Sequence, residues 1–367
     1  MRICEEQAGF SARLFVVEDG MPLVAYPYFQ RPVGALPFAG VGTEAWGDTF
    51  TPEYCGPVAL NGGLCPTGAG PDFPGLFARH CEEEGIIAEF AHLNPWDVSS
   101  DLLAPGCVQA DREIVYADLT LSAEELWARS LSHEGRRLYK QGQKTGVAVR
   151  YGKSVDDVRE FHRLYEMTMK RRRAGKRYFF PVEYFTAFFE TLPANSYFVL
   201  AEHEGRCVAG GLYLQDESNV HWHLSASDME FSHLRAVNVY QYEVMLTALG
   251  QGRKRLIMGG GFRDGDGLFR FKAAFSPLRA EFKTYRRIHN SEACSALIRE
   301  WSEHHRGAEP QDGFFPAYRS AGPSEAVTTE DRAVECVGGS GAGDGECGSQ
   351  RSSESGLAVI VPGEGLV

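Results

Sequence analysis

Two stretches of the chain, about half its length apart, share one order of elements: a β-rich run, a turn of acidic residues and glycine, and a second β-rich run. They are residues 13–29 (RLFVVEDGMPLVAYPYF) and 196–214 (SYFVLAEHEGRCVAGGLYL). This order is typical of a β-hairpin. Because a unit that recurs along a sequence indicates a repeated architecture, we expect the 367 residues to form two related domains.

The second hairpin leads into a longer series of predicted elements. A strand over residues 219–227 (NVHWHLSAS) is followed by a helix over 233–252 and a short strand over 255–258 (RLIM). A glycine-rich loop, a helix-like segment that holds Lys272 and a strand-like run over 281–290 complete the series. An antiparallel meander followed by helix, strand, helix and strand resembles the mixed sheet of GNAT acyltransferases. The expected fold class is therefore α+β.

These patterns divide the chain into three expected segments. A first domain over residues 1–145 is completed by about residues 305–320, and a second domain covers residues 146–304. Residues 321–367 are acidic and rich in Gly and Ser. Such a segment cannot bury enough apolar surface to offset its conformational entropy, so a disordered tail is predicted.

Two helices with capping signals are predicted between the hairpins. Ser122, with Glu125 three residues later, forms a capping box before residues 126–141, and Ser154 pairs in the same way with Asp157. One face of the second helix is expected to be buried: Val158, Phe161, Leu164, Tyr165, Thr168 and Met169.

The net charge of −12 argues against a general nucleic-acid-binding protein, whose affinity would come from neutralising phosphates. Two local basic blocks interrupt this acidity, over residues 135–144 (GRRLYKQGQK) and 169–177 (MKRRRAGKR). A small basic face on an acidic body is therefore compatible with the sequence.

Targeting and metal-binding signals are not found in the sequence. No run approaches the roughly 18 apolar residues that a membrane span needs, and the first residues lack the basic-then-apolar order of a signal peptide. The nine cysteines are scattered singly, without a C-x-x-C pair. We therefore expect a cytoplasmic protein with neither a disulfide framework nor a metal site.

Three patterns bear on chemistry. Residues 258–267 (MGGGFRDGDG) lack the lysine and hydroxyl of a phosphate-binding P-loop, so they are interpreted as a structural turn. Residues 228–238 (DMEFSHLRAVN) contain no glycine, whereas a GNAT enzyme that binds coenzyme A would need a glycine-containing cradle there. His221 and His223 alternate with Trp222, so both are expected on one side of the sheet, as a proton-transfer pair or as ordinary sheet residues.

Several segments together resemble the Fem family of peptidoglycan bridge-forming aminoacyltransferases. Residues 223–261 and then 267–277 (GLFRFKAAFSP) are similar to that family's G-A-S strand end, Pro-Asn-x-L-L helix, LGG strand end and F-K-x-x-F segment. Further family-like segments are residues 50–60 (FTPEYCGPVAL), 77–96 (FARHCEEEGIIAEFAHLNPW) and 136–150 (RRLYKQGQKTGVAVR). The similarity extends from about Phe10 to Arg319.

The resemblance implies two tandem GNAT-like domains that move an amino acid from aminoacyl-tRNA, as co-substrate, to an amine, without a bound cofactor. The family's acceptor is usually a UDP-linked muropeptide or a lipid-linked precursor, and relatives modify peptide or nucleoside antibiotics. The expected partners are aminoacyl-tRNA and an amine-bearing precursor. Peripheral contact with a membrane-held substrate is one option, and no stable protein partner is implied.

The resemblance also implies the site residues. Lys272 and Phe271 are expected at the transfer centre, where Lys272 is the cation that stabilises negative charge as an amine attacks an ester carbonyl. The substrate-binding residues expected by position in the matched segments are Arg173, Arg177, Tyr178, Asn238, Tyr54 and His223. The alternatives are a Lys272 that extends to solvent, a solvated helix end for the arginines and a cap or turn role for Asn238.

Departures from the family pattern leave the donated amino acid and the acceptor open: Val237 replaces a proline, Ser225 a glycine and His92 an arginine. Two other functions stay compatible with the sequence. One is an N-acyltransferase that uses acyl-CoA or an acyl carrier on a sugar nucleotide or polysaccharide precursor. The other is a non-catalytic protein that binds an anionic precursor.

Overall fold

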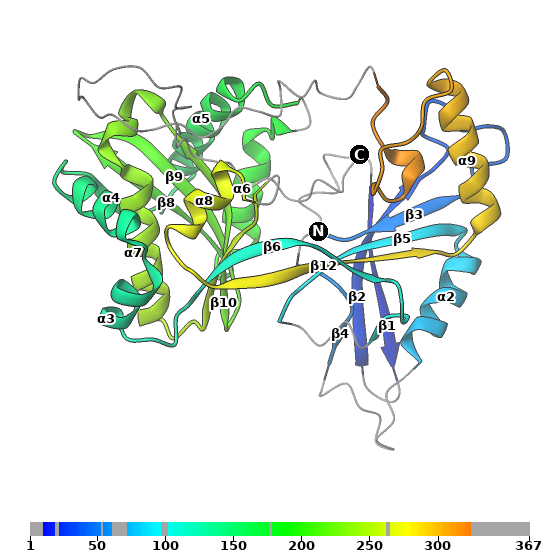
Figure 1. Ribbon diagram of the computed structural model, residues 1–367, viewed down its shortest axis with the longest axis horizontal. Helices are drawn as coiled ribbons and strands as arrows, with labels where there is room; N and C mark the ends of the chain where they lie inside the picture. Colours follow the sequence, from blue (N-terminus) through cyan, green and yellow to red (C-terminus); the bar gives the residue numbers. More distant parts are fainter. Residues whose placement is uncertain are drawn as a thin grey trace, which may run out of the picture. The chain divides into compact units, whose positions relative to one another are not determined.

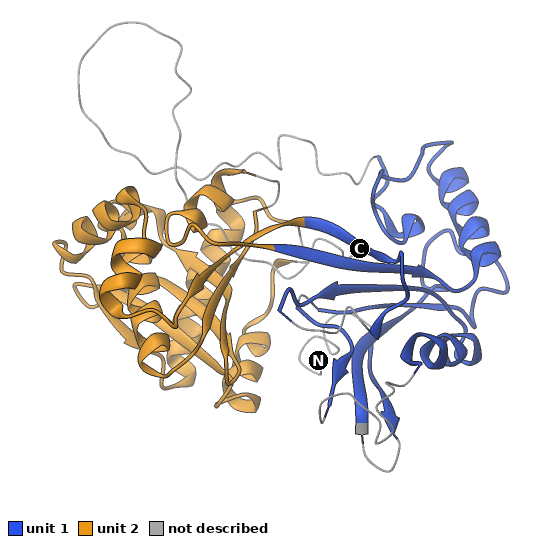
Figure 2. Cartoon of the chain, turned by 60° about the horizontal axis from the view of Figure 1, so that its bottom comes forward, with its two compact units in different colours: residues 1–111, 281–327, 362–367 blue, residues 112–280, 328–361 orange. Residues whose placement is uncertain are grey.

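The computed structural model describes residues 10–18, 22–52, 54–60, 72–96, 102–175, 178–261 and 265–323. These residues form two compact units, shown in two colours in Figure 2. Unit 1 holds the described residues up to 111 and from 281 onward, and unit 2 holds those from 112 to 280. The predicted tail lies, from residue 324 onward, outside the described residues.

Unit 1 is built on a mixed sheet. Its strands follow the order β1 (Ser11–Glu18), β2 (Pro22–Pro32), β3 (Gly47–Phe50), β5 (Ile86–Leu93) and β12 (Arg279–Ile288), and β4 (Val58–Ala59) pairs with β2. β3 and β5 are parallel, and the other pairs are antiparallel. The first predicted hairpin is confirmed as β1 and β2, whose register opposes Arg13 and Tyr28.

Two helices of unit 1, α2 (Phe73–Glu83) and α9 (Ser291–His304), pack on opposite faces of its sheet (Figure 1). Consecutive residues of β5 show this division, because Ile86 packs with the α2 cluster and Ile87 with the α9 cluster. All eight residues of β5 are buried, as expected for a strand covered on both faces.

Unit 2 is also a mixed sheet. Its strands follow the order β6 (Val108–Asp118), β11 (Arg255–Gly259), β10 (Asn219–Ser227), β9 (Arg206–Gln215), β8 (Ser196–His203) and β7 (Ala148–Tyr151). β10 and β11 are parallel, and the other pairs are antiparallel. The second predicted hairpin is confirmed as β8 and β9, and the predicted meander, helix, strand, helix and strand follow in that order.

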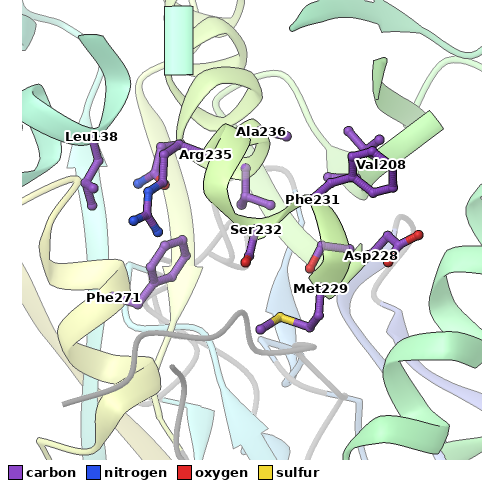
Figure 3. A pocket seen from close by; sticks show the side chains of 13 residues that line it. Leu138, Val208, Asp228, Met229, Phe231, Ser232, Arg235, Ala236 and Phe271 are labelled. Atoms are coloured by element: carbon purple, nitrogen blue, oxygen red, sulfur yellow. The ribbon is translucent and has the colours of Figure 1, made fainter. Parts of the chain in front are cut away.

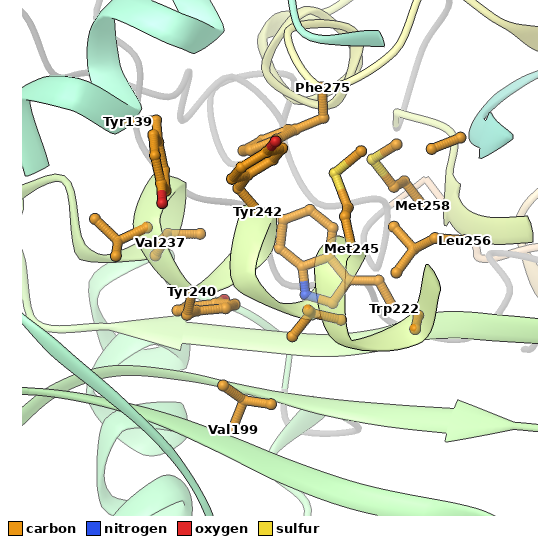
Figure 4. Close-up of a cluster of buried hydrophobic side chains, with 14 of the residues drawn as sticks. Tyr139, Val199, Trp222, Val237, Tyr240, Tyr242, Met245, Leu256, Met258 and Phe275 are labelled. Atoms are coloured by element: carbon orange, nitrogen blue, oxygen red, sulfur yellow. The ribbon is translucent and has the colours of Figure 1, made fainter. Parts of the chain in front are cut away.

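Helices cover both faces of the unit 2 sheet; the longest are α4 (His133–Gln143), α5 (Val155–Arg171), α6 (Val182–Thr191) and α7 (Ala236–Gly250). Phe198 of β8 contacts Phe161 of α5, with ring centroids 5.3 Å apart. The next residue, Val199, lies in the cluster of α7 and α4 side chains drawn in Figure 4. The two faces are thus buried under different helices, which is the α+β, GNAT-like arrangement that the sequence predicts.

Both predicted capping boxes are present. Ser122 and Glu125 exchange side-chain and backbone hydrogen bonds, and so do Ser154 and Asp157. The six residues predicted to form the buried face of α5 are all buried. These signals are local, since each cap uses residues three apart, and this explains why the sequence was sufficient to find them.

The helix expected over residues 126–141 is divided. After α3 (Ala123–Glu125), a π-helical turn covers Leu126–Ser130, and α4 begins anew at His133. The division arises because Leu131 is extended and the Ser132 side chain accepts a hydrogen bond from the Gly135 N–H, which caps a second helix.

The unit limits differ from the domain limits expected from the sequence. Residues 112–145 lie in unit 2, because β6 pairs with β11 and the Tyr139 hydroxyl of α4 donates to Glu243 of α7 at 2.8 Å. Residues 281–304 lie in unit 1, because β12 pairs with β5. Pairing between strands distant in sequence therefore decides where each unit ends.

The ladder between β10 and β11 is short. It covers Asn219–His221 and Arg255–Ile257, whereas β10 continues to Ser227 and β11 to Gly259. Both carboxyl ends therefore lie beyond the shared ladder. In open sheets of this kind, ligand sites form at such strand ends.

Candidate active site

Short helix α8 (Gly267–Ala273) carries Phe271 and Lys272. Its start is capped by Asp266, whose Oδ1 accepts a hydrogen bond from the Phe269 N–H at 2.7 Å. Gly261 lies beside this cap, and a Cβ there would displace the Asp266 carboxylate.

The end of α8 is held against the start of α4. The Ala274 carbonyl accepts a hydrogen bond from the Ser132 N–H at 2.9 Å. A side chain at Gly135 would overlap the same carbonyl oxygen, so glycine permits this close approach. The position of Lys272 therefore depends on how α4 packs.

Lys272 is buried, with 1% of its surface exposed. Its Nζ donates a hydrogen bond to the Gly260 carbonyl, one residue past the end of β11. The alternative of a lysine that extends to solvent is therefore wrong. The glycine-rich segment presents a backbone acceptor to a buried ammonium, and Gly259 within it has φ of 78°, which glycine adopts most easily.

Phe271 points to different neighbours from those of Lys272. Its ring lies 6.2 Å from Trp222 and 5.4 Å from Phe275, measured between centroids. Phe271 also lines a pocket in unit 2, whereas Lys272 is not among the lining residues. Consecutive residues of α8 thus contribute a pocket wall and a buried cation.

The pocket is formed by β9, the end of β10, the segment between β10 and α7, the first turn of α7, and one residue each of α4 and α8. Its volume is about 40 Å³. In Figure 3, Leu138, Arg235 and Phe271 line one side, and Val208 and Phe231 lie on the other. Most of the wall is apolar, as in many small-molecule sites.

Two polar atoms in this wall are unsatisfied. The Ser227 Oγ and the Asn238 Nδ2 are buried, and neither has a hydrogen-bond partner within the ranges that the structure describes. Ser227 and Asn238 are 6% and 5% exposed, and both line the pocket. Because unpaired buried polar groups are costly, such atoms indicate a site that a ligand completes.

The carboxylate in the pocket wall is already paired. Asp228 is 3% exposed, and its Oδ2 accepts a hydrogen bond from the Arg206 guanidinium at 2.7 Å. Its Oδ1 accepts from the Glu230 N–H at 3.1 Å. The Arg206 guanidinium also lies 4.7 Å from the centre of the Phe231 ring, which fixes it at the pocket margin.

Helix α7 begins at the pocket. In the described structure no side chain caps its first turn, and Arg235 precedes it with φ of 54°. Arg235 to Asn238 all line the pocket, so the positive end of the helix dipole faces it. Burial, and then the like charge of Arg137, lowers the pKa of Arg235 from its ordinary value.

A β-bulge aims the end of β10 at this pocket. Trp222 opposes Tyr213 of β9, but the next pair is Leu224 with Leu212, so His223 is the extra residue. The bulge shifts the alternation of side chains, and the Ser225 hydroxyl therefore meets the Tyr240 hydroxyl of α7 at 2.6 Å. Without the bulge, the alternation of side chains along β10 would place the Ser225 side chain on the same face of the sheet as His223.

His223 faces away from the pocket. Its Nε2 lies 3.3 Å from the Tyr184 hydroxyl of α6, on the opposite face of the sheet from α7. Burial, and then the neighbouring His221, lowers the pKa of His223 to about 4. Burial also lowers the pKa of His221 to about 4, against the opposing effect of Asp216. Both imidazoles are thus neutral at pH 7.

The other predicted substrate-binding residues lie elsewhere. Arg173 is exposed just after α5, and the Tyr178 carbonyl accepts a hydrogen bond from the Tyr165 hydroxyl at 2.6 Å. Tyr54 belongs to unit 1, where its ring centroid lies 5.2 Å from that of Phe282. Arg177 lies outside the described residues. Among the predicted residues, the pocket brings together Phe271 and Asn238, with Lys272 adjacent in sequence.

Sequence reasoning missed Ser227, Asp228, Arg206 and Arg235. The signal for the first two was their position at the carboxyl end of a strand followed by a helix, where ligand sites gather. Arg235 could have been noticed as the residue that directly precedes α7. Nothing in the sequence pairs Arg206 with Asp228, which lie 22 residues apart.

The part of the chain that the structure describes lacks clusters of metal-ligating side chains and helices that could span a membrane. Within it, no group of three or more His, Cys, Asp or Glu side chains is placed to hold a metal ion. No helix in the same ranges is long and apolar enough to cross a membrane.

Solved structures with the same fold include FemX, with 14% identity and a TM-score of 0.61, over 80% of this chain and 91% of that one. A conserved protein of unknown function from Bacteroides thetaiotaomicron has 14% identity and a TM-score of 0.54, over 78% of this chain and 88% of that one. No curated protein matched the chain in sequence. At these identities, the structural likeness shows the fold.

The relation to a family comes from a sequence profile. The FemAB family matches residues 106–206 and 202–283, which together include every residue of the pocket, α8 and the Gly260 carbonyl that holds Lys272. The matched region thus contains the whole candidate site described above. Over residues 106–283, the chain matches the FemAB family.

Proposed function

We propose that the protein transfers an amino acid from aminoacyl-tRNA to an amine of a peptidoglycan precursor, or of a peptide or nucleoside natural product, and forms an amide bond. The match to the FemAB family supports acyl transfer as the reaction. The observation that carries the finer proposal is the buried Lys272 ammonium, held by the Gly260 carbonyl one residue from a pocket wall.

The proposed chemistry needs a fixed positive charge more than a strong base. The acceptor amine attacks the ester carbonyl, a C–N bond forms, and the C–O bond to the tRNA ribose breaks. The amine gives up one proton, and the ribose oxygen takes one. Negative charge develops on the carbonyl oxygen in between, and an ammonium in a water-poor site stabilises it strongly because little reorganisation is needed. We assign this role to Lys272.

The remaining predicted residues belong to the same proposal. Arg173, Arg177 and Tyr178 would contact phosphates or the acceptor, as the positional resemblance to the Fem family over residues 10–319 implies. Phe271 and Asn238 would contact the donated aminoacyl group, since both line the pocket. Tyr54 and His223 stay candidates for the acceptor side, and no bound cofactor is expected.

The test measures transfer of radiolabel from total tRNA, charged with a mixture of amino acids, to a panel of amines. The panel contains a UDP-muropeptide, a lipid-linked precursor and aminated antibiotic scaffolds. We expect product that disappears when the charged tRNA is treated with ribonuclease before the enzyme is added. Mass analysis of the product then identifies both the amino acid and the acceptor.

A parallel arm supplies acetyl-CoA and longer acyl-CoA thioesters in place of charged tRNA. Transfer in this arm, together with transfer that survives ribonuclease, would replace the proposal with an acyl-CoA-dependent N-acyltransferase. Binding of the amines without any product in either arm would favour a non-catalytic binding protein.

A further inference from the structure

We infer that the pocket at the start of α7 receives the side chain of the donated amino acid and selects a short side chain with a hydrogen-bonding end. The amino acids with such a side chain are serine, threonine, asparagine and aspartate. This inference rests on the proposed function and deepens it, because it names the class of donor that the same site would accept.

The position of the pocket supports this role. Phe271 lines it, and the next residue is the buried Lys272. If the reacting carbonyl lies beside the Lys272 ammonium, the groups that can reach the pocket are those attached to the neighbouring Cα. These groups are the α-amine and the side chain of the amino acid.

The α-amine is a poor occupant of the pocket. An ammonium needs acceptors, but the carboxylate in the wall, Asp228, already pairs with Arg206 and with the Glu230 N–H. Arg235 and the positive end of α7 also face the pocket and would repel a cation. The side chain is therefore the group that enters.

Size and polarity then define the side chain. A volume of about 40 Å³ admits only a few atoms, so long or aromatic side chains are excluded. Ser227 Oγ and Asn238 Nδ2 are buried without partners in the part of the chain that the structure describes, and they would stay so with glycine or alanine. A hydroxyl, carboxamide or carboxylate would satisfy them, and sites built this way discriminate strongly against analogues that lack the polar group.

The test isolates the amino acid from the rest of the donor. One tRNA body is charged in turn with serine, threonine, asparagine, aspartate, alanine and glycine, and the full-length protein is added to each. Two quantities are measured: transfer to the acceptor found above, and retardation of spontaneous ester hydrolysis, which reports binding without any acceptor. We expect at least one short polar amino acid to exceed alanine and glycine by about 10- to 100-fold in both.

Two variants test the residues named. Asn238→Leu keeps the number and branching of the side-chain heavy atoms and removes the amide, and Ser227→Ala removes the hydroxyl without adding bulk. We expect each to reduce the preference for the polar amino acid over alanine by about tenfold or more, while the protein still melts cooperatively. The matched control is Asn195→Leu, in an exposed turn of the same unit, which should leave the preference unchanged.

The outcomes distinguish a failure of the donor-selectivity inference from a failure of the proposed function. Transfer or protection that is equal for all six amino acids, or greatest for glycine or alanine, would overturn the inference and leave the aminoacyltransferase function intact. So would a preference that Asn238→Leu and Ser227→Ala do not change. Absence of both transfer and protection with every charged tRNA would overturn the proposed function itself.

Discussion

The Asp48 carboxylate and the Arg319 guanidinium are 2.5 Å apart, although 271 residues separate them in the chain. Asp48 is fully buried in β3, and it also accepts hydrogen bonds from Arg31 at 2.7 Å and from the Tyr318 hydroxyl at 3.0 Å. The Asp48 carboxylate thus joins strands β2 and β3 of unit 1 to the last described helix of that unit, Ala317–Arg319.

Replacement of Asp48 should therefore destabilise unit 1. Asp48→Ala would leave the buried Arg31 guanidinium without its carboxylate, and we expect a loss of about 3–5 kcal/mol in the free energy of unfolding. Urea unfolding followed by tryptophan fluorescence measures it. Arg159→Ala removes an exposed ion pair with Asp156 and should change stability by no more than about 0.5 kcal/mol. A loss below about 1 kcal/mol for Asp48→Ala would contradict this role.

Gly135 is predicted to set the position of α8. In Gly135→Ala, the new Cβ would overlap the Ala274 carbonyl, so α8 must move, and we expect a loss of about 1–3 kcal/mol in stability together with reduced transfer. Gly250→Ala is the matched control, because open space surrounds a Cβ at that helix residue, and it should be neutral or slightly stabilising. Equal effects of the two substitutions would show that the contact with Ala274 has no special importance.

Lys272→Met should separate catalysis from folding. Methionine fills a similar volume without the charge, and buried charges contribute little to net stability, so we expect a melting temperature within a few degrees of the parent. Transfer should fall by about 100-fold or more, as with the loss of one group that stabilises an oxyanion. Lys254→Met, at an exposed position of unit 2, should retain full transfer. If Lys272→Met is active, the cation is structural and the catalytic assignment is wrong.

His223 should make stability depend on pH. Its pKa in the folded protein is lowered to about 4, against an ordinary value of 6.5, so between these values the unfolded chain binds more protons. The contribution of His223 to the free energy of unfolding is therefore fully present above about pH 6.5. It declines as the pH falls toward 4, by at most about 1.4 kcal/mol per pH unit. Partial exposure of the side chain reduces this slope.

The comparison of two variants isolates the histidine from the carboxylates, which also titrate at low pH. His223→Gln should flatten the fall in stability between pH 6.5 and pH 4, measured by urea unfolding at several pH values. His304→Gln, exposed near the end of α9, should leave the curve parallel to that of the parent. Identical slopes in the parent and in His223→Gln would mean that His223 is protonated without cost in the folded state.

Some site features could be read from single residue types, and others could not. Lys272 is expected at the transfer centre from the family-like F-K-x-x-F segment, and its side chain is buried. Asn238 was expected from the family-like helix start, and it lines the pocket. Ser227 and Arg235 were missed, because a serine at a strand end and an arginine before a helix are common on their own. Their importance comes only from sharing a wall with Phe271.

Local sequence patterns were enough to predict the two hairpins, the capping boxes at Ser122 and Ser154, and the buried face of α5. Each depends on residues a few positions apart, whose backbone and side-chain preferences act before any tertiary contact forms. Long-range pairing and packing set the unit limits, the bulge at His223 and the burial of Lys272 against Gly260. These features depend on pairing and packing between segments distant in sequence, and residue periodicity carries no information about such partners.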